Sequence, residues 1–483
     1  MTVPVATEAA QTGGVPPLAR RRPLWLVIAA ASLPMFMGTL DNLVVTNALP
    51  VIGRDLSAGI DELEWVINAY ALAFASFILT AAALGDRLGR RSVFVVGIGL
   101  FTVASALSAL STEPWQLIAA RAVQGVGAAA LMPLSLTMLA GSVSEKARPA
   151  AIGVWGGVAG LGVALGPLIG GAVTQGWAWQ GIFWVNVPVG IVAVPLVLWA
   201  LPNSFGARLR SDLIGLVLAG SGVFGIVYGI VRGNDAGWGS GEVLTALIGG
   251  GALIAAFIWW ETRAAAPMLP LRLFRFPSFT IANAVGLIFS FGIFGSIFIL
   301  IQFLQVVQGK NPLEAGEMTM PWTLLPLVIS PFTGFLLVPR FGPRLPVAAG
   351  LAISAAAIAW IALIMAPDLT FAHMVPPFLL AGLGMGLIFA PSSTAELMDM
   401  PAPDHAKASG ANSTLREIGT ALGIAVLTAV FTGAGGQLTP TGYVDAAQKA
   451  VLVGAAVLAL AALVSLGLPG RRAVAATSLS PEV

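Results

Sequence analysis

Residues 149–207 contain no charged side chain, although this stretch is long enough to cross a membrane twice. A helix that spans a bilayer needs about 20 mainly apolar residues, and similar apolar runs recur along the whole chain. The composition agrees, because 57% of the residues are hydrophobic and only 10% are charged, against about 25% charged in soluble globular proteins. A soluble core of this size could not bury so much apolar surface. The sequence therefore predicts an all-α polytopic membrane protein.

Segmentation at this length predicts fourteen transmembrane helices. The first follows the basic triplet Arg20–Arg22, and its apolar run is too long for a signal peptide and has no evident cleavage site. The predicted spans are 24–48, 64–84, 92–111, 115–139, 148–173, 181–201, 213–232, 243–261, 278–304, 318–338, 345–366, 374–397, 408–432 and 447–468.

Positive charges are distributed unevenly between the predicted loops. Of the 24 Lys and Arg residues, eighteen fall in the terminal segments and the loops on the same side, four in the opposite loops and two within spans. Cytoplasmic loops carry an excess of Lys and Arg, so both termini are predicted to be cytoplasmic. The expected location is the plasma (cytoplasmic) membrane, as a multi-pass protein.

Two loops repeat one pattern. Residues 84–91 read LGDRLGRR and residues 337–344 read LVPRFGPR, so Leu, Arg, Gly and Arg recur at matching spacing. The large offset between the loops fits two six-helix bundles separated by two inserted helices. The predicted organisation is a cytoplasmic N-terminal tail (1–23), an N-terminal six-helix bundle (24–202), two inserted transmembrane helices with linkers (203–270), a C-terminal six-helix bundle (271–468) and a cytoplasmic C-terminal tail (469–483).

Ionisable side chains within the spans are few, and each costs about 2.5–3.5 kcal/mol at the bilayer centre. Asp41 lies about 26 Å along the first helix, in the outer part of the membrane. It is either a helix-end carboxylate solvated at the interface or a carboxyl in a cavity that exchanges protons. Arg121 in the fourth helix is either a structural clamp or part of proton coupling.

A second charged pair, Arg416 and Glu417, lies in the thirteenth helix. Adjacent side chains point about 100° apart on a helix, so the two groups need separate partners. We expect Glu417 to take part in proton coupling together with Asp41 and Arg121. The alternative is a locally neutralised pair with no role in coupling.

Polar side chains at helical depth are candidates for the lining of a substrate cavity. The alternative for each is a hydrogen bond between helices, which serves packing rather than binding. The candidates are Asn42, Asn68, Tyr70, Gln124, Gln302, Gln305, Asn412 and Arg416.

The sequence carries no signature of an enzyme or an ATPase. It contains no cysteine and only two histidines, and it lacks a phosphate-binding loop, a nucleophile elbow and a zinc-protease motif. We therefore predict no enzymatic activity, no metal and no cofactor, with a proton gradient as the energy source. The expected partners are a small amphipathic substrate, protons and the lipid bilayer, without nucleic acid, and the protein is expected to work as a monomer.

Several short motifs occur in order on the predicted helices. They are LDNLVVTNALP at 40–50, LGDRLGRR at 84–91, RAVQG at 121–125, GLGVALGPLIGG at 160–171, NVPVG at 186–190 and LQVVQG at 304–309. Together they resemble the motifs of the fourteen-span drug:proton antiporter branch of the major facilitator superfamily, over about 24–468. The chain departs from that pattern at Ala82, where glycine is usual, and at Pro339, which aligns with Asp86.

The resemblance implies a major facilitator fold, in which two six-helix bundles rock about a site at the midplane. It also implies that Asp41 binds a proton and competes with a cationic substrate, with Arg121 tuning it. For the loop 84–91, the resemblance implies a cytoplasmic latch between the bundles, formed by Asp86, Arg87, Gly89, Arg90 and Arg91. The alternative is that these charges only set the membrane topology.

In water the glycine-rich stretch 160–171 would be a loop, because Gly and Pro are poor helix formers. Its glycines at every fourth position share one helix face and let another backbone approach closely, and its proline is expected to kink the helix. The resemblance implies that this is the antiporter motif of exporters, formed by Gly162, Gly166, Pro167, Gly170 and Gly171.

These observations predict a proton-coupled exporter (drug:H+ antiporter) of amphipathic drug-like compounds or antibiotics, working by alternating access. One alternative is a dedicated exporter of a single metabolite or lipid. A more remote alternative is a non-transporting membrane receptor or channel, although the sequence lacks the charged rings and filter loops usual in channels.

Overall fold

The computed structural model describes residues 23–144, 147–205, 212–265, 267, 269–400 and 405–470, and the regular structure within these ranges is entirely helical. One 3₁₀ segment (η1) and two π-helical turns (η2 and η3) accompany the α-helices. The elements are α1 (Leu24–Asp55), α2 (Ile60–Leu88), α3 (Arg90–Ala109), α4 (Pro114–Ser142), α5 (Arg148–Gly176), α6 (Gly181–Trp184), α7 (Asn186–Ala200), α8 (Leu213–Ala236), α9 (Gly241–Glu261), η1 (Leu271–Arg275), α10 (Pro277–Gln302), η2 (Phe303–Val307), α11 (Pro312–Phe332), η3 (Thr333–Leu337), α12 (Val338–Phe341), α13 (Arg344–Ile364), α14 (Phe371–Leu397), α15 (His405–Gly433) and α16 (Val444–Ser465).

Each predicted span falls on one of these helices or on consecutive segments, such as α6 with α7. Within the described ranges, 12 helices are long and apolar enough to cross a membrane. The number reaches 14 when α2 and α5, which bend by 46° and 41°, are each counted as one span. The predicted all-α polytopic fold is confirmed.

Local chemistry explains where several helices begin and end. The Asp212 carboxylate accepts a hydrogen bond from the Gly215 amide (2.7 Å) at the start of α8, and Asn311 Oδ1 accepts one from the Glu314 amide (2.8 Å) at the start of α11. These bonds satisfy amide donors that a first helical turn leaves open. Gly89 separates α2 from α3 with a φ of +103°, a conformation that glycine adopts without strain.

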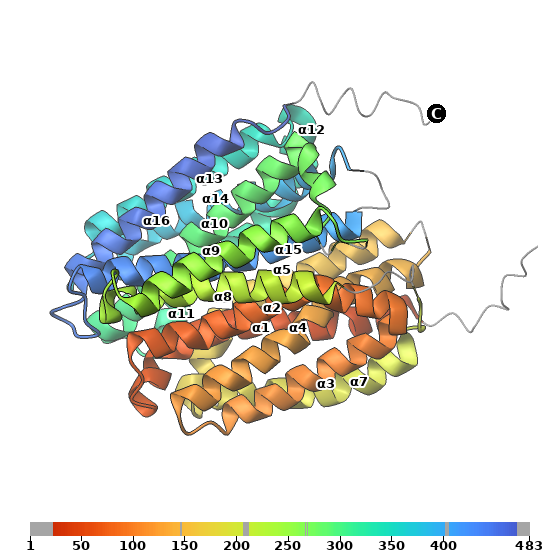
Figure 1. Ribbon diagram of the computed structural model, residues 1–483. Helices are drawn as coiled ribbons and strands as arrows, with labels where there is room; N and C mark the ends of the chain where they lie inside the picture. Colours follow the sequence, from red (N-terminus) through yellow and green to blue (C-terminus); the bar gives the residue numbers. More distant parts are fainter. Residues whose placement is uncertain are drawn as a thin grey trace, which may run out of the picture.

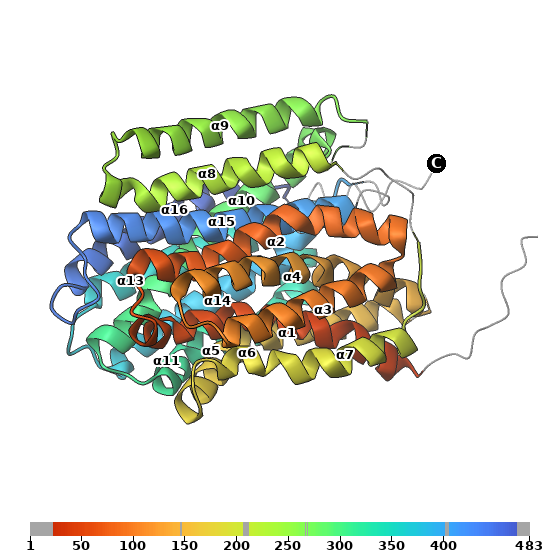
Figure 2. The same cartoon turned by 60° about the horizontal axis from the view of Figure 1, so that its bottom comes forward.

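The helices pack in two groups. In the first group, α1–α7, the main pairings are α1 with α5, α2 with α4, and α3 with α4 and α7; in the second, α10–α16, they are α10 with α15, α11 with α14, and α13 with α14 and α16. Figure 1 shows each group as long, roughly parallel helices. The remaining pair, α8 and α9, lies along one side, with α8 against α2 and α15 (Figure 2). The domain boundaries expected from the sequence stay predictions.

The two ends of the bundle differ in charge. The described chain begins and ends at the same end (Figure 1). We call this the basic end, because the loops there carry Arg87, Arg91 and Arg344. The other end, where Asn47 and Pro312 lie, is called the opposite end.

The two groups meet where α5 runs between α1 and α11. An added Cβ at Gly166 would lie 2.7 Å from the Leu43 Cβ, and one at Gly170 would lie 2.9 Å from the Val44 Cα. Gly171 lies against the Pro312 carbonyl of α11 in the same way. The close backbone approach expected in the glycine-rich stretch is therefore present, and a side chain at these positions would push the helices apart.

The expected kink in α5 is also present. The axis bends by 41° between Val154–Gly162 and Ala164–Gly176. The bend lies four residues before Pro167, at the carbonyl that loses its helical hydrogen bond to the proline nitrogen. The Pro167 carbonyl accepts a hydrogen bond from Asn47 Nδ2 (2.8 Å), which ties the bent helix to α1.

Replacement of Gly166 by leucine is expected to lower transport more than tenfold and to leave membrane insertion intact. The new side chain has no room against Leu43, and overpacking a core costs about 1–3 kcal/mol. The measurements are dye transport in proteoliposomes and the melting temperature in detergent. Gly157→Leu is the matched control on the same helix, because an added Cβ at Gly157 meets nothing within 4 Å. Normal transport by Gly166→Leu would contradict the role of close packing.

Candidate functional site

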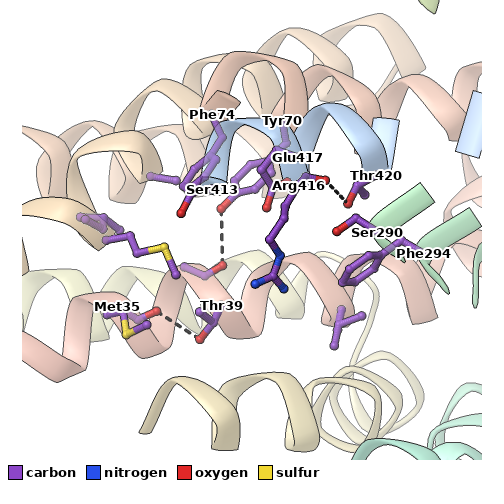
Figure 3. Close-up of a pocket in the computed structure, with 15 residues that line it drawn as sticks. Met35, Thr39, Tyr70, Phe74, Ser290, Phe294, Ser413, Arg416, Glu417 and Thr420 are labelled. Atoms are coloured by element: carbon purple, nitrogen blue, oxygen red, sulfur yellow. Dashed lines mark hydrogen bonds between the residues drawn. The ribbon is translucent and has the colours of Figure 1, made fainter. Parts of the chain in front are cut away.

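A cavity of about 170 Å³ lies between the two helix groups. We call it the central cavity (Figure 3). Helices α1, α2 and α4 of the first group and α10 and α15 of the second supply its walls. Its lining residues are Met35, Gly38, Thr39, Leu43, Tyr70, Phe74, Ala128, Leu131, Met132, Ser290, Phe294, Ser413, Arg416, Glu417 and Thr420.

Both members of the charged pair on α15 line this cavity. Figure 3 shows the Arg416 side chain extending from α15 toward α1, and its guanidinium carbon lies 5.4 Å from the centre of the Phe389 ring. Glu417 Oε2 is buried and has no hydrogen-bond partner among the described residues. The cavity thus combines a largely apolar wall with one guanidinium and one carboxyl group.

Asp41 is fully buried and lies behind the cavity wall, inside the first helix group. It forms an ion pair with Arg121 of α4, and its Oδ1 accepts hydrogen bonds from Gln124 Nε2 (2.8 Å) and Asn186 Nδ2 (2.9 Å). The Ser105 hydroxyl accepts further bonds from Gln124 (2.7 Å) and Asn186 (3.2 Å). We call these five side chains the Asp41 network.

One aromatic ring separates the Asp41 network from the central cavity. The guanidinium carbon of Arg121 lies 4.3 Å from the centre of the Tyr70 ring, and Tyr70 itself lines the cavity. The Tyr70 hydroxyl donates a hydrogen bond to the Gly38 carbonyl of α1 (3.4 Å). A change in the charge of Asp41 can therefore reach the cavity through Arg121 and this ring.

Arg121 has protein partners at Nε and Nη1, whereas its buried Nη2 has none among the described residues. Its Nη1 contacts Asp41 and donates to Gln124 Oε1 (2.7 Å), and its Nε donates to the Val66 carbonyl (3.2 Å). Removal of one member of a buried ion pair costs about 3–5 kcal/mol, because the remaining charge is left uncompensated. Asp41 and Arg121 thus form an ion pair, and the role of both residues in proton coupling stays a prediction.

Hydrogen bonds join the two groups on the side of the cavity that faces the opposite end. Asn47 Nδ2 donates to the carbonyls of Pro167 on α5 (2.8 Å) and Pro312 on α11 (2.9 Å). Gln305, in the π-helical turn η2, donates to the Asn47 carbonyl (2.7 Å). Short π-helical turns occur often at functional sites. These bonds join α1, α5, α11 and η2, and we call them the Asn47 seal.

The loop at 84–91 forms its described bonds within the first helix group. Asp86 pairs with Arg90 (2.7 Å), and Arg91 Nη1 donates to the carbonyls of Leu198 (3.1 Å) and Leu201 (3.2 Å) next to the end of α7. The side chain of Arg87 is exposed. The loop thus holds together the basic end of one group in this conformation, and a latch between the groups stays a prediction.

The residues predicted to line the cavity separate into two sets. Tyr70 and Arg416 line it, whereas the others described lie within the helix groups or at the Asn47 seal. Gln302 donates to its own helix, at the Phe298 carbonyl (3.4 Å), and Asn412 donates to Asn283 (3.3 Å). The others are Gln124 in the Asp41 network, Gln305 in the seal, the buried Asn68 and Asn42, whose side chain is outside the described residues.

Several residues at the site were not singled out from the sequence. The aromatic and sulfur side chains of the cavity give no signal in helices that are apolar on every face. The hydroxyl groups are equally ambiguous, since a membrane helix can satisfy them with its own carbonyls. Asn186 belongs to the motif at 186–190, so this motif could have indicated that Asn186 contributes to the Asp41 network. The cavity residues missed include Met35, Phe74, Met132, Ser290, Phe294 and Ser413.

Comparison with known proteins decides the family. The profile of the Major Facilitator Superfamily matches residues 24–424. The chain belongs to the Major Facilitator Superfamily. Multidrug resistance protein Stp of Mycobacterium tuberculosis (strain CDC 1551 / Oshkosh) is 36% identical over 407 residues, which cover 84% of this chain and 75% of Stp. The methylenomycin A resistance protein of Bacillus subtilis (strain 168) is 33% identical over 457 residues, 93% of this chain and 96% of that protein.

A solved structure shows the same fold at low sequence identity. The crystal structure of the POT family transporter PepTSo matches with a TM-score of 0.64 and 14% identity, over 94% of this chain and 99% of that chain. At this identity the match concerns the fold alone. The expected membership of the superfamily and the expected fold are both confirmed.

Replacement of Asn47 by leucine is expected to loosen the Asn47 seal. The change removes the side-chain bonds to Pro167 and Pro312, and a hydrogen bond between buried groups contributes about 0.5–1.5 kcal/mol. Because the chain contains no cysteine, Thr319→Cys gives a single reporter thiol at a small void beside the seal. We expect a membrane-impermeant maleimide to label this thiol about tenfold faster in the Asn47→Leu background.

The matched control for the seal is Asn283→Leu. Asn283 is buried to a similar extent, but its bonds stay within the second helix group: it donates to the Phe279 carbonyl of its own helix (2.8 Å) and accepts from Asn412 of α15 (3.3 Å). This control should leave the labelling rate of Thr319→Cys unchanged. Equal labelling rates with and without Asn47→Leu would show that these bonds do not keep the groups together.

Proposed function

We propose that this chain is a proton-coupled exporter of amphipathic drug-like compounds or antibiotics that works by alternating access. The observation that carries the proposal is a cavity between the two helix groups, largely apolar but with one guanidinium and one carboxyl group. Membership of the Major Facilitator Superfamily supports transport. Relatives that match most of the chain are named multidrug resistance and methylenomycin A resistance proteins, which supports export.

In this proposal the protein lies in the plasma membrane with both termini and the basic end in the cytoplasm. The Asn47 seal then closes the cavity toward the outside, so this conformation is the one that receives substrate from the cell. Rocking of the groups about the contact of α5 with α11 would break the seal and release the substrate outside. The protein is proposed to work as a monomer without a cofactor, and not as an enzyme.

Asp41 is the proposed proton-coupling group. Protonation removes the negative charge that pairs with Arg121 and leaves the guanidinium with Gln124 and the Val66 carbonyl. A buried cation that loses its counter-charge is strongly destabilised. This free-energy cost favours a rearrangement of the helices around Arg121. The contact of Arg121 with Tyr70 carries this change to the cavity. Glu417, in the cavity wall, is the second proposed proton site.

A dedicated exporter of one compound is the second candidate function. It is favoured by the relative named for resistance to methylenomycin A alone. A panel of unrelated dyes and antibiotics in proteoliposomes separates the two functions. Transport of many of them supports multidrug export, and transport of one supports a dedicated exporter. Passive flux without saturation or counterflow would point instead to a channel and contradict both.

Replacement of Asp41 by asparagine is expected to abolish acceleration of efflux by a pH gradient. Asparagine resembles the protonated carboxyl group in shape, so it fixes the network in one charge state. Exchange of substrate without a gradient should continue, because Asp41 is not one of the residues that line the cavity. The measurements are efflux of fluorescein and of rhodamine 123 from proteoliposomes, with and without an imposed pH gradient, and we expect at least a tenfold loss of the gradient-driven part.

The control for this prediction is Asp445→Asn, in the exposed first turn of α16. It removes a carboxylate without touching the Asp41 network, so gradient-driven efflux should match the wild type. Retained counterflow in Asp41→Asn shows that the variant is folded. Gradient-driven efflux at the wild-type rate in Asp41→Asn would remove Asp41 from the proposal.

A further inference from the structure

Arg416 is a cation in the central cavity, and the two acidic side chains near it, Glu417 and Glu396, form no ion pair with its guanidinium among the described residues. No ion pair within 4.0 Å and no side-chain hydrogen bond joins its guanidinium to another described residue, and its ring contact with Phe389 occupies no N–H donor. A guanidinium carries five donors and remains charged. A half-buried group of this kind is therefore an open site for an acceptor that comes from outside the protein.

The contrast with Arg121 shows that this chain partners an intramembrane arginine where the role is internal. Arg121 contacts a carboxylate, a side-chain amide and a backbone carbonyl. Arg416 extends into the cavity instead (Figure 3). Since an uncompensated charge in a low-dielectric site is costly, a ligand that brings a negative charge gains more at Arg416 than a neutral ligand does.

Glu417 does not cancel this preference. It is the neighbour of Arg416 on α15, and adjacent side chains diverge by about 100° on a helix. No ion pair joins Arg416 to Glu417, or to Glu396 of α14, the other acidic group near it, among the described residues. The lining residues from α1, α2, α4 and α10 bring no further Asp, Glu, Lys or Arg. Arg416 is thus the cation of the lining, and Glu417 is available to accept a donor of the same ligand.

The rest of the wall selects an apolar body. Phe74, Phe294, Met35 and Met132 line the cavity together with Tyr70. Aromatic rings and thioethers pack against flat or irregular apolar groups, and an arginine binds a carboxylate through two parallel hydrogen bonds. The wall therefore matches a compound that carries an acidic group at one edge of an aromatic framework.

We propose that the central cavity selects amphipathic organic acids, whose carboxylate or acidic phenolate pairs with Arg416 while the apolar body packs on the aromatic and methionine side chains. This inference rests on the proposed export function and narrows its substrate class. It assigns the role of substrate anchor to Arg416 rather than to a carboxylate that binds cations.

Two dyes with the same xanthene ring system test the proposal. Fluorescein is an anion and rhodamine 123 is a cation, so their difference in affinity reports charge selection by the cavity. The purified full-length protein should bind fluorescein at least tenfold more tightly than rhodamine 123, measured by fluorescence anisotropy in detergent. Arg416→Gln should lose at least tenfold in fluorescein affinity and should not lose affinity for rhodamine 123. Arg416→Lys should recover part of the loss, because it keeps the charge but not the two-pronged geometry.

The control variant is Arg263→Gln. Arg263 lies over the Trp259 ring at 4.2 Å, outside the cavity lining, so fluorescein affinity should not change. The melting temperature adds a structural readout: Arg416→Gln should not lower it, because that arginine has no described ionic partner, whereas Arg121→Gln should lower it.

Each outcome bears on one of the two proposals. Equal fluorescein affinity in the wild type and Arg416→Gln, or tighter binding of rhodamine 123 by the wild type, overturns the selection of acids. If Arg416→Gln does not fold, the affinities of the wild type for the two dyes still test whether the cavity selects acids. Absence of transport of either dye and of an antibiotic panel by the wild type in proteoliposomes overturns the export function, while the binding result continues to test the role of Arg416.

Discussion

The contact of α5 with α1 and α11 is the interaction on which the rest of the site depends. In a bilayer, lipid chains are as apolar as leucine, so helices associate through close packing and polar contacts rather than through the hydrophobic effect. Glycines at 166, 170 and 171 remove the side chains that would hold the backbones apart. That proximity brings the Pro167 and Pro312 carbonyls within reach of Asn47. The same packing therefore joins the two helix groups and closes one end of the cavity between them.

Two arginines within the helix bundle, Arg121 and Arg416, differ in how their charges are balanced. Arg121 is held by the Asp41 network and is fully buried, so its charge is balanced by the protein. Arg416 stands at the cavity and lacks such a partner among the described residues. Because every intramembrane charge is costly, we propose that the first serves coupling and structure and that the second binds a ligand. The Tyr70 ring lies between the two systems, in contact with Arg121 and exposed to the cavity.

This layered arrangement gives a physical basis for antiport. In the proposed mechanism a proton need not meet the substrate directly, since Arg121, the partner of Asp41, is separated from the cavity by the Tyr70 ring. Substrate binding and proton binding can therefore influence each other through packing and electrostatics rather than through competition for one carboxylate. The direct competition between a proton and a cationic substrate at Asp41, which the family resemblance implies, stays a prediction.

The sequence by itself predicted the all-helical membrane fold, the superfamily and the presence of a proline-bent, glycine-packed helix, because each follows from apolar length or from a local motif. It also identified Asp41 and Arg121, since ionisable groups in apolar spans are rare. Only the tertiary structure decided that Tyr70 and Arg416, of the eight polar candidates, line the cavity together with Glu417, whereas the Asp41 network lies behind its wall. The physical reason is that a membrane helix is apolar on every face, so its sequence carries no polar stripe to show which side meets lipid, protein or cavity. The environment of each face is determined by neighbouring helices that come from distant parts of the chain.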